Sequence, residues 1–186
     1  TNYRLYSEQF DNAAWGSLSG GTATANTAVA PDGTTTADTI NCAVVYRGLG
    51  QPTALAATVG ATYTFSVYLA GTVGQTCRIR VANTTGTVTA ATTDVTLTAA
   101  FARYSATVTL AGGATGVMDC WVAREAGQTA ASFYAWGAQL ELAAAASTYV
   151  RTTSATATSL AAFKVTGLTV SSTNMTAGQM LTIDGR

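Results

Sequence analysis

Apolar and polar residues alternate along several short segments of this chain, and the spacing of an amphipathic helix is nearly absent. In residues 62–69 every second side chain is large and apolar, namely Tyr63, Phe65, Val67 and Leu69. Side chains that repeat with a period of two lie on one face of a β-strand. The pattern therefore predicts a half-buried strand of an antiparallel sheet, with Tyr68 on the opposite, outward face.

Three further segments share this period and are predicted as strands: residues 77–83, 102–110 and 133–142. In the first, Cys77 and Ile79 face inward while Arg78 and Arg80 face outward. In the second, the inward residues are Tyr104, Ala106, Val108 and Leu110. In the third, a continuous alternation places five residues on one apolar face: Tyr134, Trp136, Ala138, Leu140 and Leu142.

Turn-forming residues separate these segments. They occur at Pro31-Asp32-Gly33, Gly71 to Gly74, Asn83 to Gly86, Gly112-Gly113 and Gly116. Turns that recur between short strands are typical of a sandwich or barrel. A parallel fold would need crossover helices, which no segment predicts. The sequence therefore predicts an all-β, antiparallel sandwich.

The two ends of the chain differ from this pattern. Residues 7–15 predict a turn or a single helical turn that delivers Phe10 and Trp15 as core anchors. We also interpret Trp136 as a core anchor. After Arg151 the chain is rich in Thr, Ser, Ala and Gly. We therefore divide it into a domain of residues 1–153 and a segment of residues 154–186, which is an extra strand pair, an extended arm or the start of a further domain.

Charge is scarce: charged residues make up 10% of the chain and the net charge is zero, against roughly 25% in an average soluble domain. Two interpretations stay open. The surface is either coated with hydroxyl groups or covered by other subunits in the working assembly. The absence of a basic stripe argues against a nucleic-acid partner. No apolar run approaches the roughly 20 residues that span a bilayer, so we expect no membrane partner.

Three cysteines stand far apart in the sequence: Cys42, Cys77 and Cys120. An odd number with this spacing does not predict a disulfide framework or a metal site. We interpret them as buried free thiols that pack as small apolar groups. A single bridge between Cys77 and Cys120 is the alternative.

Five motifs in a consistent order carry a resemblance to a known family. They are LYSEQFDNAAW (residues 5–15), APDGTTTADTI (30–40), YTFSVYLAG (63–71), FARYSATVTL (101–110) and FYAWGAQLELAAAASTYVRTT (133–153). Together they cover about residues 3–153. This part of the chain resembles the jelly-roll domains, similar to carbohydrate-binding modules, of tailed-bacteriophage virion proteins such as head-decoration proteins, head fibres and tail fibres.

The resemblance implies an antiparallel jelly-roll sandwich on the surface of a phage particle. We expect a structural virion protein, either a capsid decoration or cement protein or a fibre component. Its expected partners are further copies of itself in a homo-oligomer and other virion proteins such as the major capsid protein. The alternative is a carbohydrate-binding module or receptor-binding domain that attaches to a host-surface glycan.

Catalysis is not expected. The chain has no histidine, which removes the commonest general base and the Ser-His-Asp triad. A glycosidase needs only two carboxylates about 5 to 10 Å apart, and the nine acidic residues are spread singly. One pair, Asp119 with Glu141 on adjacent strands, is the alternative that would make the protein an enzyme. No cofactor is expected apart from a structural calcium ion.

Two candidate sites follow from residue chemistry. Sugar rings stack on flat aromatic side chains that have polar neighbours, and the candidates are Tyr46, Tyr68, Trp121 and Tyr134. Core packing is the competing interpretation for each of them. Calcium prefers oxygen ligands at turns, and the candidate ligands are Asp11, Asn12 and Asp38.

Overall fold

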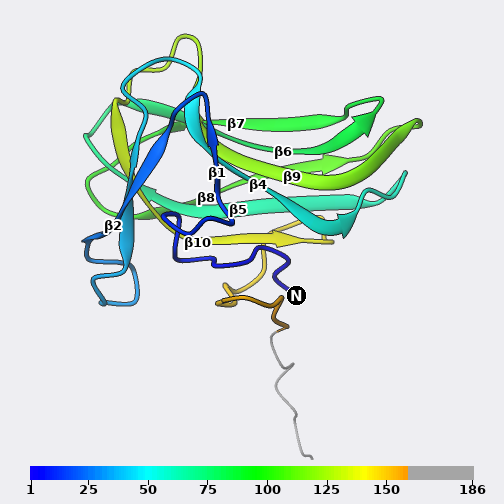
Figure 1. The fold of residues 1–186 in the computed structure, drawn as a ribbon, viewed down its shortest axis with the longest axis horizontal. Helices are drawn as coiled ribbons and strands as arrows, with labels where there is room; N and C mark the ends of the chain where they lie inside the picture. Colours follow the sequence, from blue (N-terminus) through cyan, green and yellow to red (C-terminus); the bar gives the residue numbers. More distant parts are fainter. Residues whose placement is uncertain (159–186) are drawn as a thin grey trace, which may run out of the picture.

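Two five-stranded sheets pack face to face in the computed structural model, which describes residues 1–158 (Figure 1). Sheet A has the strand order β1 (Gly16–Leu18), β4 (Arg47–Ala56), β9 (Ala114–Arg124), β6 (Thr76–Gly86) and β7 (Ala90–Thr96). Sheet B has the order β2 (Thr22–Ala28), β3 (Ala37–Asn41), β10 (Ser132–Glu141), β5 (Thr62–Ala70) and β8 (Ala102–Thr109). Every pair of neighbouring strands is antiparallel. This architecture confirms the predicted jelly-roll sandwich.

The core lies between the inner faces of the two sheets. From β5 it receives the four alternating residues Tyr63, Phe65, Val67 and Leu69, each at most 1% exposed. Sheet A contributes Cys77, Ile79 and Val81 from β6. The thiols of the three cysteines, Cys42, Cys77 and Cys120, are all free and buried. The predicted faces of these strands are therefore confirmed, and the alternative bridge between Cys77 and Cys120 is wrong. No helix within residues 1–158 is long and apolar enough to span a bilayer.

The predicted alternation of residues 133–142 is interrupted at its centre, so the inward and outward faces are exchanged for the residues before Gly137. A bulge in β10 shifts the register with β5 between Trp136 and Gln139, and Gly137 there has a φ of 64°. An extra residue in one strand exchanges the faces of the residues that follow it. Phe133 therefore faces the core before the bulge and Leu140 faces it afterwards. Trp136 is buried at 5% exposure, as predicted, but on the outer side of sheet B.

Two predicted turns lie inside strands instead. Residues 83–86 belong to β6, and Gly116 belongs to the opposing β9. The pairing of these strands is irregular there, with a register shift between Asn83 and Thr85. Gly116 has a φ of 82°, a conformation that glycine adopts without steric cost. Turn-type residues thus mark an irregular strand pair at this place, and the chain reverses after Gly86.

The N-terminal segment packs across one end of the sandwich. Phe10 and Trp15 are buried with ring centroids 4.4 Å apart, which confirms their role as anchors. The backbone makes turns here and no helix. The carboxylate of Asp38 on β3 fixes this segment, because Oδ2 accepts hydrogen bonds from the backbone N–H groups of Phe10 (2.6 Å) and Asp11 (3.3 Å).

The chain that follows β10 returns across the outer face of sheet B and is called the strap, residues 143–152. Beyond the strap, Ala157 pairs with Asn2 in an antiparallel bridge. The two ends of the described chain therefore lie side by side, below sheet B in Figure 1. Most of the segment predicted as an arm or accessory β element falls on residues 159–186, which lie outside the described residues.

Candidate functional site

The outer face of sheet A carries a row of residues that no other segment within residues 1–158 covers. Strand register places Gly50 of β4, Trp121 of β9 and Arg80 of β6 next to one another. The neighbouring residues in each strand, Leu49, Val122 and Ile79, point into the core. By alternation the first three side chains therefore face outward. Asp119 lies two residues before Trp121 on the same face of β9.

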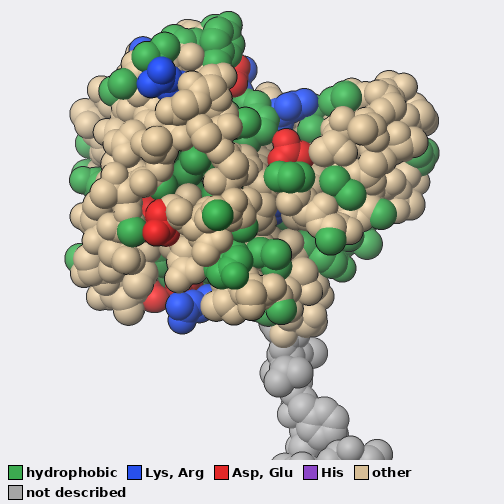
Figure 2. Space-filling view, in the orientation of Figure 1, with side chains coloured by type: hydrophobic (Ala, Val, Ile, Leu, Met, Phe, Trp, Pro, Cys, Tyr) green, Lys and Arg blue, Asp and Glu red, His purple; other side chains and the backbone are tan. Residues whose placement is uncertain are grey.

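A groove of about 300 Å³ opens on this face beside Asp119. Its floor is largely backbone, because Gly16 and Gly50 pair across β1 and β4 without side chains. Leu18, Pro52 and Thr84 form its walls. Figure 2 shows the surface hollowed between two lobes, with basic and acidic side chains close to the hollow. The groove thus combines a backbone floor, apolar wall residues such as Leu18 and Pro52, and the carboxylate of Asp119.

Two charged groups on this face have no partner within residues 1–158. Asp119 makes no hydrogen bond or ion pair there, and the guanidinium of Arg80 lies 5.7 Å from the centroid of the Trp121 ring without contacting a carboxylate. By contrast, the nearby Arg78 is neutralised by Asp94, with 2.5 Å between Nε and Oδ1. Arg80 and Asp119 are therefore the charges available to a ligand.

Trp121 is less accessible than its sequence position suggested. Its side chain is only 8% exposed, because Arg80 lies over the ring and β4 approaches on the other side. A Cβ atom at Gly50 would lie 3.2 Å from the Cβ of Trp121. Trp121 therefore borders the groove and supports Arg80, and it is not the open stacking platform that we expected.

The outer face of sheet B is closed by the strap. Tyr68 does point outward, as predicted, but it lies in a second apolar cluster with Trp136 and Tyr149. The ring centroids of Tyr68 and Tyr149 are 6.3 Å apart, and those of Trp136 and Tyr149 are 4.8 Å apart. The guanidinium of Arg103 covers Tyr68 at 5.5 Å. The residue predicted as the best outward aromatic is therefore half-buried, packed against the strap residue Tyr149.

Polar groups beneath the strap are paired with it. Gln139 Oε1 accepts a hydrogen bond from the backbone N–H of Val150 at 2.7 Å. Glu141 accepts hydrogen bonds from the backbone N–H and the hydroxyl of Ser147. Burial acts to raise the pKa of Glu141, but these hydrogen bonds to Ser147 and one from Gln139 outweigh it, so the pKa is lowered. The polar side chains of Gln139 and Glu141 are therefore engaged by the strap.

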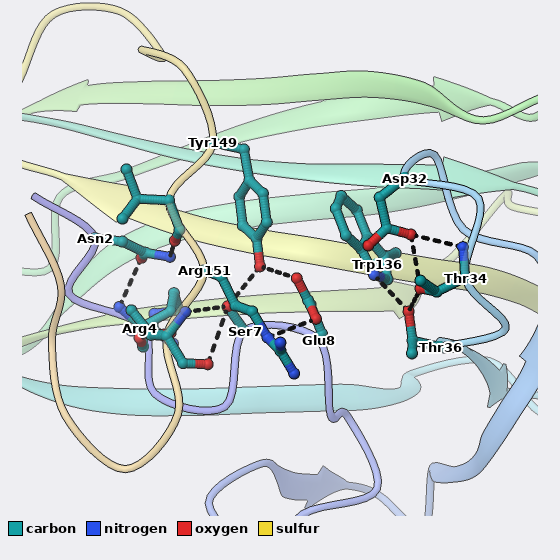
Figure 3. A network of polar contacts seen from close by, with 12 residues as sticks. Asn2, Arg4, Ser7, Glu8, Asp32, Thr34, Thr36, Trp136, Tyr149 and Arg151 are labelled. Atoms are coloured by element: carbon teal, nitrogen blue, oxygen red, sulfur yellow. Dashed lines mark hydrogen bonds and ion pairs between the residues drawn. The ribbon is translucent and has the colours of Figure 1, made fainter. Parts of the chain in front are cut away.

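The end of the strap is held by the N-terminal segment. Figure 3 shows Tyr149, Glu8 and Arg151 pointing toward one another: Tyr149 Oη donates to Glu8 Oε1 at 3.1 Å, and Arg151 Nε lies 2.9 Å from Glu8 Oε2. Burial raises the pKa of Glu8, and Arg151 opposes this shift only in part. Burial also raises the pKa of the Tyr149 hydroxyl. The network therefore fastens the strap and exposes no reactive group.

The remaining predicted sugar-binding residues lie on separate surfaces. Tyr46 precedes β4, is 56% exposed and has a φ of 69°. Tyr134 on β10 is 37% exposed beside a shallow hollow of about 80 Å³. Neither lines the groove on sheet A. The four aromatic candidates thus do not form one site.

The proposed calcium ligands are engaged otherwise. Both oxygens of Asp38 face N–H donors, since Oδ1 accepts from the backbone of Asn26 at 2.8 Å and Oδ2 accepts from Phe10 and Asp11. The Asn12 side-chain oxygen accepts from the backbone N–H of Ala14. Donors that point at the carboxylate occupy the positions a cation would need. The side-chain oxygens of Asp38 and Asn12 are therefore engaged within the protein, whereas Asp11 contributes only its backbone N–H, and the calcium site stays a prediction.

The suggested catalytic pair is also separated. Asp119 lies on β9 of sheet A and Glu141 on β10 of sheet B, so the two are not on adjacent strands. The buried Glu141 is bound to the strap, while Asp119 faces the groove. Within residues 1–158 no cluster of three or more acidic or cysteine side chains could hold a metal ion. Among the described residues that line the groove, Asp119 is the one acidic side chain.

Sequence reasoning missed the groove and its glycine floor. The alternation in residues 77–83 already placed Arg80 on the outward face. The sequence pattern did not indicate which strands would pair with this segment. Gly16 and Gly50 stand 34 positions apart in the sequence and become neighbours only through the pairing of β1 with β4. The missing signal was long-range register.

Comparisons with known proteins bear on the fold. No family model and no curated protein matches this chain. A cyclase from Fischerella sp. TAU superposes with a TM-score of 0.57 at 11% identity, covering 77% of this chain and 98% of the cyclase. The CBM22-1–GH10 modules of Clostridium thermocellum endo-1,4-β-D-xylanase 10B, complexed with xylohexaose, give 0.54 at 14% identity over 75% of this chain. Tailspike protein 4 of bacteriophage CBA120 gives 0.54 at 14% identity over 76%.

This chain spans 27% of the xylanase chain and 21% of the tailspike chain. At such low identity the similarity extends to the fold alone. The protein thus has the jelly-roll sandwich that carbohydrate-binding modules, a phage tailspike domain and cyclases share.

Proposed function

We propose that this chain is a non-catalytic carbohydrate-binding module that holds a glycan in the groove of sheet A. The observation that carries the proposal is the contrast in pairing on this face. Asp119 lines the groove without a partner within residues 1–158, and Arg80, further along the same face over Trp121, contacts no carboxylate there, while Arg78 is neutralised by Asp94. Hydrogen bonds from sugar hydroxyls to ionised groups are stronger than those between neutral groups. Asp119 accepts from hydroxyl groups and Arg80 donates to them.

The glycine floor gives this site its shape. A sugar ring has a flat apolar face, which can lie against the bare backbone of Gly16 and Gly50. Leu18 and Pro52 then contact the edges of the ring. Sites of this kind bind through mostly apolar contact and fix orientation with a few polar groups. Structural similarity to a carbohydrate-binding module supports the fold required for this role.

Filling the groove tests the proposal. A Cβ atom at Gly16 would meet only the backbone oxygen of Gly50, at 3.6 Å, so Gly16→Leu adds a side chain to the groove without a clash. Gly112 lies in a turn with nothing within 4 Å, and Gly112→Leu is the matched control. We expect wild type and Gly112→Leu to bind on an array of bacterial surface polysaccharides and plant xylans, and Gly16→Leu to lose binding. A silent array for wild type would refute the proposal.

A second proposal concerns where the module works. We propose that it sits on a tailed-phage particle as a decoration, cement or fibre component, in a homo-oligomer that contacts other virion proteins such as the major capsid protein. The sequence motifs support this role.

Purified particles test this second role. We expect antibodies against the domain to label the surface of the phage particle in electron micrographs. We also expect sedimentation of the isolated chain to show an oligomer in solution. A monomeric chain that is absent from particles would leave only glycan binding.

A further inference from the structure

A second cavity, of about 320 Å³, adjoins the groove at the free end of β4. Pro52 lines both the cavity and the groove. The cavity's apolar wall is formed by the N-terminal segment and β4, through Tyr3, Leu5, Pro52, Ala54 and Leu55. In Figure 2 the hollow between the two lobes continues toward the place where the described chain ends. A ligand longer than the groove would therefore enter this cavity next.

The polar side chains of β4 in the cavity wall are already engaged. Gln51 binds both backbone groups of Leu5: its Oε1 accepts from the N–H at 2.9 Å and its Nε2 donates to the carbonyl at 3.1 Å. The hydroxyl of Thr53 donates to the Met118 carbonyl at 2.9 Å and accepts from the N–H of Leu55. These amide and hydroxyl groups therefore stabilise the wall and are not free for a ligand.

This engagement determines what the cavity can hold. A sugar hydroxyl that enters it loses hydrogen bonds to water, and among the lining side chains only the hydroxyls of Tyr3 and Thr156 could replace them. A methyl group that enters it leaves water for an apolar wall, which is favourable. The adjoining groove, with the unpaired carboxylate of Asp119 in its wall, has the opposite preference. Groove and cavity together match a polar sugar backbone with apolar substituents.

We infer that this module selects acetylated glycans, with the sugar backbone in the groove and an acetyl group in the cavity lined by Tyr3, Ala54 and Leu55. The inference rests on the proposed glycan binding and adds the substituent that is recognised. Each buried methyl group contributes about a fourfold gain in affinity.

The full chain is tested against two matched pairs of probes by isothermal titration calorimetry. One pair is acetylated xylan and the same xylan after alkaline deacetylation. The other is chitohexaose, which carries N-acetyl groups, and cellohexaose, which has the same linkage without them. We expect the acetylated member of at least one pair to bind about fourfold tighter or more. Equal affinity within both pairs overturns the inference and leaves glycan binding standing.

A second experiment places a charged side chain in the cavity wall. Ala54 is exposed on β4, so Ala54→Asp places a carboxylate at the apolar wall without disturbing the core. We expect this variant to lose the preference for acetylated probes and to bind the deacetylated ones as wild type does. Val73→Asp, at a residue 70% exposed and outside the cavity wall, is the matched control and retains the preference. A preference that survives Ala54→Asp overturns the cavity assignment. Binding to none of the four probes overturns the inference as well, and the polysaccharide array then decides glycan binding itself.

Discussion

The outer faces of the two sheets use similar residues in opposite ways. Sheet A carries Trp121 with Arg80 above it, and sheet B carries Tyr68 with Arg103 above it. On sheet B the strap lies over this pair and engages the polar groups around it, including Gln139. On sheet A no described segment does so, and Asp119 stays unpaired. An aromatic ring beside an arginine is therefore structural on one face and part of a candidate site on the other.

The difference shows that residue type does not decide which face binds. Both arginines lie within 6 Å of an aromatic centroid. What differs is the covering chain, because each hydrogen bond to the strap replaces one that water or a ligand would make. The following changes separate the two faces, starting with the largest expected effect.

Removing Trp136 should destabilise the fold without affecting ligand binding. Its ring is 5% exposed, packs against Tyr149, and donates from Nε1 to Thr36 Oγ1 at 3.1 Å. We expect Trp136→Ala to lower the free energy of unfolding by about 3–5 kcal/mol, measured by urea denaturation. A loss below about 1 kcal/mol would mean that the strap does not seal this face.

Removing the charges of sheet A should weaken ligand binding and leave the stability of the fold nearly unchanged. Asp119→Ala and Arg80→Ala each delete an unpartnered charged group, and hydrogen bonds to such groups contribute about 1.5–3 kcal/mol. We expect about tenfold weaker glycan binding or more by calorimetry, with the free energy of unfolding changed by less than about 0.5 kcal/mol. Asp94→Ala, which breaks the ion pair with Arg78, serves as the control outside the groove.

A smaller effect is expected where the strap meets the N-terminal segment. Tyr149→Phe removes the hydroxyl that contacts Ser7 Oγ at 2.6 Å and Glu8 at 3.1 Å, but keeps the ring. We expect the free energy of unfolding to fall by about 1 kcal/mol, read from the urea midpoint. Unchanged glycan affinity would keep the two faces independent, whereas weakened affinity would show that they are coupled.

The smallest expected effect is on the pH dependence of stability. Burial raises the pKa of Glu8 above its ordinary value of 4.5. The folded state therefore binds this proton more tightly than the unfolded state does. The stabilising contribution is complete below the ordinary pKa and is lost as the pH rises through the raised one. We expect Glu8→Gln to remove this decline from the unfolding free energy measured between about pH 3 and pH 7, and an unchanged slope would contradict the shift.

Much of the fold could be predicted because alternation is a local property. The four inward residues of β5 and the three of β6 are consecutive odd positions, and burial of one face requires that period in any antiparallel sandwich. The pattern failed at Gly137, where a bulge exchanged the faces. A left-handed backbone at one glycine leaves no mark on the hydrophobic pattern around it.

The candidate site was less predictable than the fold. Trp121, Arg80 and Asp119 were each visible as outward or polar residues, but Gly16 and Gly50 gain meaning only when β1 pairs with β4. Tyr68 was placed on the correct face and given the wrong role. Its cover, Tyr149, comes from a segment 81 positions further along the chain.

The sequence by itself determined that this protein is an antiparallel sandwich with an apolar interior, because strand periodicity and turn residues act over a few neighbouring positions. Only the tertiary structure decided which outer face is open. That choice depends on the path of the strap and on contacts such as Ser7 with Thr152 and Arg103 with Ser147. Residues so far apart in the chain become neighbours only in the folded structure, so no local pattern in the sequence reports their contacts.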